Sequence, residues 1–460
     1  MALVSEYEAM SQKGTVGFFE EKVFFKIIEY YQKADQLDRA IEVADHALGQ
    51  YTYSVEFYLL KSQMLLEKGC KHLALSCLER AEIFAPQELE LHLLRAEVFT
   101  AMGYTEDAFA ILERIKDDVS DEQLCEIFFC EACIHEHLEQ FDSMFFALRD
   151  AILADPSNKS VIRRLWLSVE MSGAYAESIE LYQFLIDKDP YCYISWYNLG
   201  HAYYCLKDFE HAAQAFEYAY LIDETFEFAY RDCADAWIKL KEYGKALACY
   251  EEALGFVEPD SDLYLHIGYC YECLQDIGLA YSFYRKAIHL KANNDTVYFR
   301  LGECYASEKK WGNAIRAYHK AIEIDSRKEE YLKALAEAYY QVDEPEKARQ
   351  LFKKAADTAP EYSEYWIHYA SFLMDINEVD GALAVLDEAG YYAPGVDLEY
   401  CRVACLFMLD RRQEALYLLS EVLTEDFKSH DTLFEWVPGL ENDLDVQSVL
   451  AAYQMPHSDN

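Results

Sequence analysis

The sequence has few of the features that mark a membrane protein or a nucleic-acid-binding protein. No stretch approaches the roughly 18 consecutive apolar residues of a membrane-spanning helix, and the first residues lack a basic segment followed by an apolar run. We therefore expect neither membrane insertion nor a signal peptide. Basic residues are scarce, since 41 Lys and Arg stand against 83 Asp and Glu, a net charge of −42. Such an excess of negative charge repels phosphate backbones, which argues against nucleic-acid partners.

The motifs that build catalytic sites are equally sparse. The chain has only 17 glycines and no glycine-rich phosphate loop, and it lacks the H-E-x-x-H and G-x-S-x-G patterns of metalloproteases and serine hydrolases. Its 14 cysteines are scattered without a framework spacing, which is typical of reduced thiols in a cytoplasmic protein. We therefore expect a cytoplasmic protein that is not an enzyme and needs no cofactor.

The chain does contain a repeat with a period of 34 residues. Self-similarity at such a period is the signature of stacked helix pairs, because each pair buries its apolar face only against the next. Two additional residues near Asp121 shift the phase once. The predicted units start at Glu21, Val55, Leu89, Cys125, Lys159, Tyr193, Glu227, Ser261, Asp295, Glu329, Ser363 and Asp397.

Residue size follows fixed positions within the unit. From the unit at Tyr193 onward, position 8 is glycine or alanine, as at Gly200, Gly268 and Gly302, and positions 20 and 27 are alanine in most units. Position 24 is bulky, as at Phe216 and Tyr284. We expect the small side chains to let two helices approach closely and the bulky ones to fill the space between units.

These residues carry a resemblance to a known family. The unit from Tyr193 has small and aromatic residues at Trp196, Leu199, Gly200, Tyr203, Ala212, Phe216 and Ala219. Their order resembles the W-x-x-L-G-x-x-Y, A, F/Y, A, P pattern of the tetratricopeptide repeat (TPR) family. The resemblance implies an all-α, right-handed α-solenoid (superhelix) of about twelve helix-turn-helix units over residues 21–430. We expect an N-terminal cap in residues 1–20, C-terminal capping helices in residues 431–454 and a disordered tail in residues 455–460.

The resemblance also places positions 2, 5, 9 and 12 of each first helix on a concave groove. In this chain those positions hold fourteen acidic residues, four basic residues and eight Phe or Tyr residues. Such a lining favours a partner segment that carries Lys or Arg and a few apolar anchors. The hypothesis is a scaffold or adaptor that binds a basic or amphipathic segment of a partner protein. The candidate partner-binding residues are Phe129, Arg163, Tyr197, Asn198, His201, Tyr204, Phe228, Arg231, Asp235, Tyr269, Phe299 and Glu303.

Alternatives to this hypothesis remain. The acidic groove also suits a chaperone for positively charged client proteins, and an architectural subunit would bind through its convex face instead. A metal-binding or redox protein is a further alternative, because Cys130, Cys133 and His137 share one helix face at spacings i, i+3 and i+7. Asn198 matches the asparagine with which some TPR domains hold a carboxylate, but Leu167 and Asp232 depart from that clamp.

Overall fold

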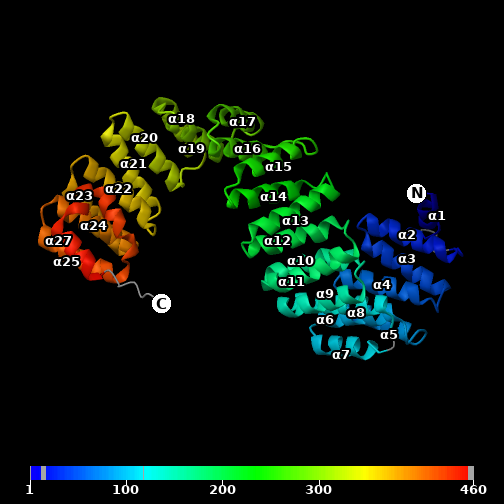
Figure 1. The fold of residues 1–460 in the computed structure, drawn as a ribbon. Coiled ribbons are helices and arrows are strands. Elements are labelled where there is room, and N and C mark those ends of the chain that lie inside the picture. Colours follow the sequence, from blue (N-terminus) through cyan, green and yellow to red (C-terminus); the bar gives the residue numbers. More distant parts are fainter. Residues whose placement is uncertain (1, 12–16, 118, 454–460) are drawn as a thin grey trace. The chain divides into compact units, whose positions relative to one another are not determined.

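The computed structural model describes residues 2–11, 17–117 and 119–453 (Figure 1). Every regular element in these ranges is a helix, and none of the helices is long and apolar enough to cross a bilayer. The chain divides into two compact units, Met1–Leu240 (unit 1) and Lys241–Asn460 (unit 2), which are described separately. The prediction of an all-α solenoid built from helix pairs is confirmed, because consecutive helices pack side by side in each unit.

Unit 1 contains the first fourteen α-helices. They are α1 (Ala2–Ser11), α2 (Glu21–Lys33), α3 (Leu37–Gln50), α4 (Val55–Glu67), α5 (Lys71–Glu82), α6 (Leu89–Met102), α7 (Thr105–Ile115), α8 (Asp121–His137), α9 (Phe141–Ala154), α10 (Lys159–Ser172), α11 (Tyr175–Lys188), α12 (Tyr193–Cys205), α13 (Phe209–Ile222) and α14 (Glu227–Lys239). Even-numbered helices are the first helices of the predicted units. Some of them also contact the next first helix, as α4 contacts α6 and α6 contacts α8, so they share one face.

Unit 2 continues the same alternation. Its helices are α15 (Tyr243–Ala253), α16 (Ser261–Cys273), α17 (Ile277–Leu290), α18 (Asp295–Ser307), α19 (Trp311–Ile324), α20 (Glu329–Gln341), α21 (Pro345–Thr358), α22 (Ser363–Asp375), α23 (Val379–Tyr392), α24 (Val396–Met408), α25 (Arg412–Glu425), α26 (Thr432–Trp436) and α27 (Leu444–Tyr453). Short 3₁₀ helices at Lys428–Asp431 and Pro438–Asn442 flank α26.

Most first helices begin at the residue where the repeat places a unit, but α8 does not. It starts at Asp121, four residues before Cys125. Ser120 accepts a hydrogen bond from the backbone N–H of Gln123, and the Gln123 side chain accepts one from the backbone N–H of Ser120. This capping box satisfies two helix-end donors and lengthens the helix at its N-terminus. The two additional residues near Asp121 therefore become one more turn of helix rather than a loop.

The small residues of position 8 pack against the aromatic ring of their own helix pair. A Cβ atom added at Gly302 would lie 2.4 Å from the ring of Tyr318, and one at Gly200 would lie 2.6 Å from Phe216. The bulky residues of position 24 thus lie over the glycine within each pair, whereas we expected them to fill the space between units. Because the pair closes on the ring, helix spacing in these units depends on the missing Cβ.

The turn inside each helix pair shows a regularity that the sequence does not reveal. A residue with a positive φ angle stands at position 15 of the first eleven units and at position 14 of the last. These residues are Asp35, Gly69, Gly103, Glu139, Gly173, Lys207, Lys241, Gln275, Lys309, Asp343, Asn377 and Asp410. The two backbone N–H groups at this turn bond back to the preceding helix, as Gln275 does to Glu272 and Asp276 to Tyr271. This is a Schellman-type end, which ordinarily favours glycine.

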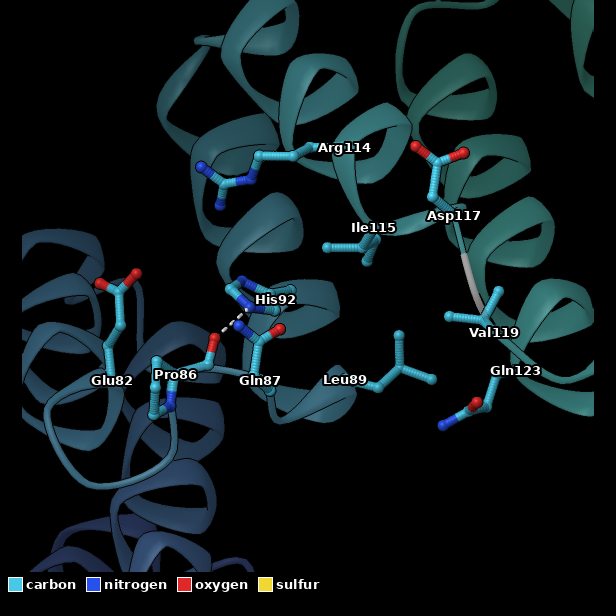
Figure 2. Close-up of a pocket in the computed structure, with 10 residues that line it drawn as sticks. All are labelled: Glu82, Pro86, Gln87, Leu89, His92, Arg114, Ile115, Asp117, Val119 and Gln123. Atoms are coloured by element: carbon cyan, nitrogen blue, oxygen red, sulfur yellow. Dashed lines mark hydrogen bonds between the residues drawn. The ribbon is translucent and has the colours of Figure 1, made fainter.

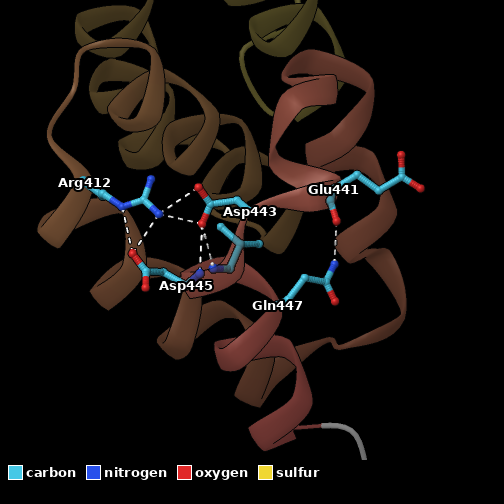
Figure 3. Close-up of polar contacts among 6 residues, drawn as sticks. Arg412, Glu441, Asp443, Asp445 and Gln447 are labelled. Carbon is cyan, nitrogen blue, oxygen red and sulfur yellow. Dashed lines mark hydrogen bonds and ion pairs between the residues drawn. The ribbon is translucent and has the colours of Figure 1, made fainter.

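Additional contacts cover the ends of the two units. In unit 1 the hydroxyl of Tyr31 donates to Glu8 at 2.9 Å, so α1 packs on the first pair. In unit 2 the Arg412 guanidinium contacts Asp443 at 2.6 Å and Asp445 at 2.8 Å, while Asp443 also accepts the backbone N–H of Val446 (Figure 3). This arrangement ties α25 to the start of α27. The assignment of these segments as caps stays a prediction, and the tail expected to be disordered lies outside the described residues.

Candidate functional site

The central candidate cluster of unit 1 joins two neighbouring first helices. The Tyr197 hydroxyl of α12 donates to Oδ2 of Asp232 on α14 at 2.6 Å, and Nε2 of His201 lies 3.2 Å from the same oxygen. Burial, the hydrogen bond and the charge of Asp232 together raise the pKa of Tyr197. The hydroxyl therefore stays protonated at neutral pH and acts as a donor. Tyr197 and His201 thus brace α12 against α14.

Aromatic rings surround this brace. The Tyr197 ring centroid lies 4.8 Å from that of Phe226 and 5.5 Å from that of Phe216. His201 lies 5.0 Å from Trp166 and 5.1 Å from Phe216. Such edge and tilted contacts are the favoured aromatic geometries. The cluster is therefore a packed aromatic surface with its polar groups satisfied internally.

Two predicted residues of this region remain available to a partner. Phe228 is 61% exposed and touches only the edge of the cluster, through Phe226 at 5.9 Å. Arg163 on α10 is exposed and makes no hydrogen bond or ion pair with any residue that the structure describes. An exposed aromatic ring and a free guanidinium are both effective contact groups in protein interfaces.

The other predicted residues of unit 1 are engaged within the protein. Asn198 is only 5% exposed and lies beside the Tyr182 hydroxyl. Tyr204 packs against Phe209 at 5.2 Å, and Arg231 pairs with Glu227 at 2.7 Å. Two further members are partly buried side chains, Phe129 and Asp235. Asn198 therefore has a structural environment, and a partner would reach it only after the core opened.

The three predicted residues of unit 2 also have internal partners. The Arg300 guanidinium lies 4.7 Å from the ring centroid of Tyr269. Burial and a hydrogen bond with Cys273 raise the pKa of Tyr269 to about 12. The remaining two are Phe299, which stacks on Tyr331 at 4.6 Å, and Glu303, which accepts the Tyr318 hydroxyl at 2.5 Å.

Carboxylates on the first helices of unit 2 are matched by donors and cations. Glu272 accepts the hydroxyl of Tyr284 at 2.5 Å and lies 3.8 Å from Arg300. Nζ of Lys333 lies 3.6 Å from Glu364 and 3.9 Å from Glu337. Burial raises the pKa of both Glu272 and Glu337. Each of these carboxylates therefore has a donor or a cation beside it, and burial still keeps the pKa of Glu272 and Glu337 above the usual value.

Unit 1 carries an acidic row that the sequence interpretation did not single out. It consists of Glu56 on α4, Glu90 on α6 and Glu126 on α8, all at position 2 of their units. Partial burial raises the pKa of Glu90, and the charges of Glu88, Glu126 and Glu56 raise it further. None of these carboxylates forms an ion pair with a described residue. The signal was present in the sequence as glutamate at position 2 of three successive units.

The cysteine–histidine alternative does not gain geometric support. Cys130 is buried and its thiol points to the carbonyl of Leu93 at 3.9 Å, while His137 is exposed. Burial raises the pKa of the Cys130 and Cys133 thiols, which disfavours the thiolate that a metal requires. In the described ranges no three His, Cys, Asp or Glu side chains are grouped to hold a metal ion.

Models of protein families match several parts of the chain. Tetratricopeptide repeat models match residues 193–226, 261–294, 306–366 and 343–400. The first two matches begin at Tyr193 and Ser261, where the repeat also places unit starts. A model of ChAPs, described as Chs5p-Arf1p-binding proteins, matches residues 19–120.

Solved structures provide a further comparison. Yeast Tom70 is 14% identical with a TM-score of 0.45, covering 95% of this chain and 96% of its own. The Cut9–Hcn1 hetero-tetramer of the APC/C is 13% identical with a TM-score of 0.40, covering 84% and 97%. YrrB, described as a TPR protein with an unusual peptide-binding site, is 21% identical with a TM-score of 0.34, covering 40% and 95%. No curated protein sequence matches the chain.

Proposed function

We propose that unit 1 binds a basic, amphipathic segment of a partner protein. The chain belongs to the tetratricopeptide repeat family, whose scaffolds mediate protein–protein interactions. The mechanism is stoichiometric binding without chemical turnover. The segment lies along the first helices, with its Lys or Arg side chains on the acidic row and an apolar side chain beside Phe228.

The observation that carries this proposal is the mutual repulsion within the acidic row. Burial raises the pKa of Glu90, and the charges of Glu88, Glu126 and Glu56 raise it further. Like charges held close together without a counter-ion destabilise the free protein. A partner's ammonium or guanidinium group would relieve that repulsion. Charge complementarity of this kind speeds association and selects among partners.

The apolar part of the interaction is assigned to Phe228. Exposed aromatic rings supply much of the free energy in protein interfaces, because they bury a large area at a small entropy cost. Phe228 lies on α14, whereas the acidic row lies on α4, α6 and α8, so a bound segment would follow several first helices. The ChAPs family is named for proteins that it binds, which is consistent with a protein partner here.

A pair of synthetic peptides tests the proposal directly. One is an amphipathic helix of leucine and lysine, and the other has every lysine replaced by glutamate. We expect the full chain to bind the basic peptide in fluorescence anisotropy, to bind it more weakly as salt is added, and to ignore the acidic peptide.

Matched charge variants then locate the site. The triple variant Glu56→Gln, Glu90→Gln, Glu126→Gln is expected to weaken binding about three- to 150-fold, because each exposed pair contributes roughly 0.2–1 kcal/mol. The control Glu79→Gln, Glu106→Gln, Glu180→Gln removes the same charge from exposed positions on second helices. Equal loss of affinity in both variants would contradict the assignment, since net charge alone would then explain binding.

A further inference from the structure

A separate cavity of about 690 Å³ lies in unit 1, where the segments between α5 and α6 and between α7 and α8 approach each other (Figure 2). Its volume is in the range of small-molecule sites. Polar groups of Gln87, His92 and Arg114 line one side, and the aliphatic side chains of Leu89, Ile115 and Val119 line the other.

The imidazole of His92 determines what hydrogen bond a ligand must make. The side chain is only 5% exposed, and its Nε2 lies 3.0 Å from the carbonyl oxygen of Pro86. A carbonyl can only accept, so Nε2 carries the hydrogen and Nδ1 of the neutral ring is an acceptor. Nδ1 is buried and has no partner in the described part of the chain. Because an unpaired buried acceptor is costly, a ligand that donates to Nδ1 gains affinity.

Arg114 supplies the second requirement. It lies in the last turn of α7, lines the same cavity, and makes no hydrogen bond or ion pair with a described residue. A guanidinium presents paired N–H donors that fit a carboxylate with two parallel hydrogen bonds. The combination of a free guanidinium and a buried acceptor therefore fits a ligand with an anionic group next to a donor.

We propose that this cavity binds a carboxylate that has a hydrogen-bond donor on its α-carbon and an aliphatic side group. The carboxylate contacts Arg114, the α-substituent donates its N–H or O–H to Nδ1 of His92, and the side group packs on Leu89, Ile115 and Val119. A free N-acylamino acid and the C-terminus of a polypeptide both have this chemistry.

The acidic side chains near the cavity do not oppose this assignment. Glu82 is neutralised by Arg95, whose Nη1 lies 2.8 Å from the carboxylate. Figure 2 shows the carboxylate of Asp117 directed away from His92. The side chains of Arg114 and His92 thus lie on the same side of the cavity (Figure 2).

N-acetyl-leucine is the probe of choice, titrated into the full chain and followed by protein NMR. A ligand of this size is expected to bind with a Kd on the order of 0.1–1 mM. N-acetyl-leucinamide lacks the charge, and 4-methylpentanoate lacks the α-donor, so both should bind at least tenfold more weakly. A short peptide with a C-terminal leucine and a free carboxylate identifies the source: tighter binding than N-acetyl-leucine assigns a polypeptide end, and equal or weaker binding assigns a free acid.

Two variants connect the binding to the residues. Arg114→Gln should weaken the binding of N-acetyl-leucine roughly tenfold or more, because a charge-assisted hydrogen bond is lost. His92→Gln retains a side-chain N–H for the Pro86 carbonyl but removes the ring acceptor. It should weaken the binding of N-acetyl-leucine about fivefold. Thermal unfolding of each variant verifies folding.

Arg80→Gln is the matched control for the charge. Arg80 is also exposed in the last turn of its helix, α5, but does not line the cavity. The proposal is overturned if no probe binds by about 10 mM, ten times the weakest expected Kd. It is also overturned if leucinamide or 4-methylpentanoate binds as well as N-acetyl-leucine, or if Arg80→Gln weakens binding as much as Arg114→Gln does.

Discussion

The first helices of the two units carry similar residue types, but the surroundings of their carboxylates differ. In unit 2, Glu272 accepts a hydrogen bond from Tyr284 and faces Arg300, while Glu337 and Glu364 approach Lys333. In unit 1 the acidic row of Glu56, Glu90 and Glu126 has no cation among the described residues. Carboxylates with a donor or a cation beside them contribute to packing within the protein, whereas carboxylates without one are free to bind a partner.

Tyrosine at position 24 supplies the hydrogen-bond donors of two of the unit 2 pairs. In unit 2, Tyr284 and Tyr318 each lie over a position-8 glycine and donate a hydroxyl to a glutamate of the first helix. In unit 1 the corresponding residue over Gly200 is Phe216, which has no hydroxyl to give. One oxygen atom therefore separates an aromatic residue that only fills space from one that also holds a carboxylate.

The largest expected effect comes from filling the space over a glycine. Gly302→Leu should destabilise unit 2 by about 3 kcal/mol, because a Cβ already meets the Tyr318 ring at 2.4 Å and the ring is held by Glu303. Urea denaturation followed by circular dichroism measures the change. Gly312→Leu is the control, since nothing lies within 4 Å of a Cβ there. Similar losses at both glycines would mean that contact with the ring does not set the cost, since leucine has a higher helix propensity than glycine.

A smaller effect is expected when the hydroxyl alone is removed. Tyr284→Phe should cost about 1–2 kcal/mol, because Glu272 loses its donor while it remains partly buried. Urea denaturation measures the loss, and adding Glu272→Gln should restore part of it by removing the unsatisfied charge. A fully stable Tyr284→Phe protein would show that the tyrosine–glutamate bond does not distinguish the units.

The turns inside the helix pairs should respond alike in both units. Lys207→Gly in unit 1 and Lys309→Gly in unit 2 should each stabilise by about 0.5–1 kcal/mol, because both lysines have φ angles near 60° and glycine adopts this region without strain. Thermal unfolding measures the gain. A loss of stability at either site would indicate that the lysine side chain itself contributes.

The smallest expected effect is on the pH dependence of stability, to which two glutamates of unit 2 should contribute with opposite signs. Burial raises the pKa of Glu272, so the folded state binds its proton more tightly and loses stability as pH rises from about 4.3 through the folded pKa. The hydrogen bond and charge of Arg349 lower the pKa of Glu378. Its contribution to the stability of the folded state is therefore lost as pH falls through the folded pKa.

Melting temperatures between pH 3 and pH 8 measure both effects. As pH rises, the melting temperature of Glu272→Gln should increase relative to that of the unsubstituted protein. The melting temperature of Glu378→Gln should decrease relative to it over the same interval. Parallel curves for the protein and the Glu272→Gln variant would contradict the stated environment of Glu272.

The repeat length, the helix pairs and the small residues of position 8 could be predicted from the sequence, because they depend on local spacing. The left-handed turn residues could not be, since nine of the twelve are not glycine. Nor could the pairing of Glu303 with Tyr318, or the buried acceptor of His92, because both depend on which atoms meet across helices. The sequence therefore predicts which acidic and aromatic residues lie on one face. It does not predict which of them remain without a partner inside the protein.

Hydrogen–deuterium exchange with the basic leucine–lysine peptide tests the central claim most directly. The account predicts slower exchange in α4, α6 and α8 on peptide addition, with α18 and α20 unchanged, and loss of this protection in the triple glutamine variant of the acidic row. Protection confined to unit 2 or to second helices would contradict it.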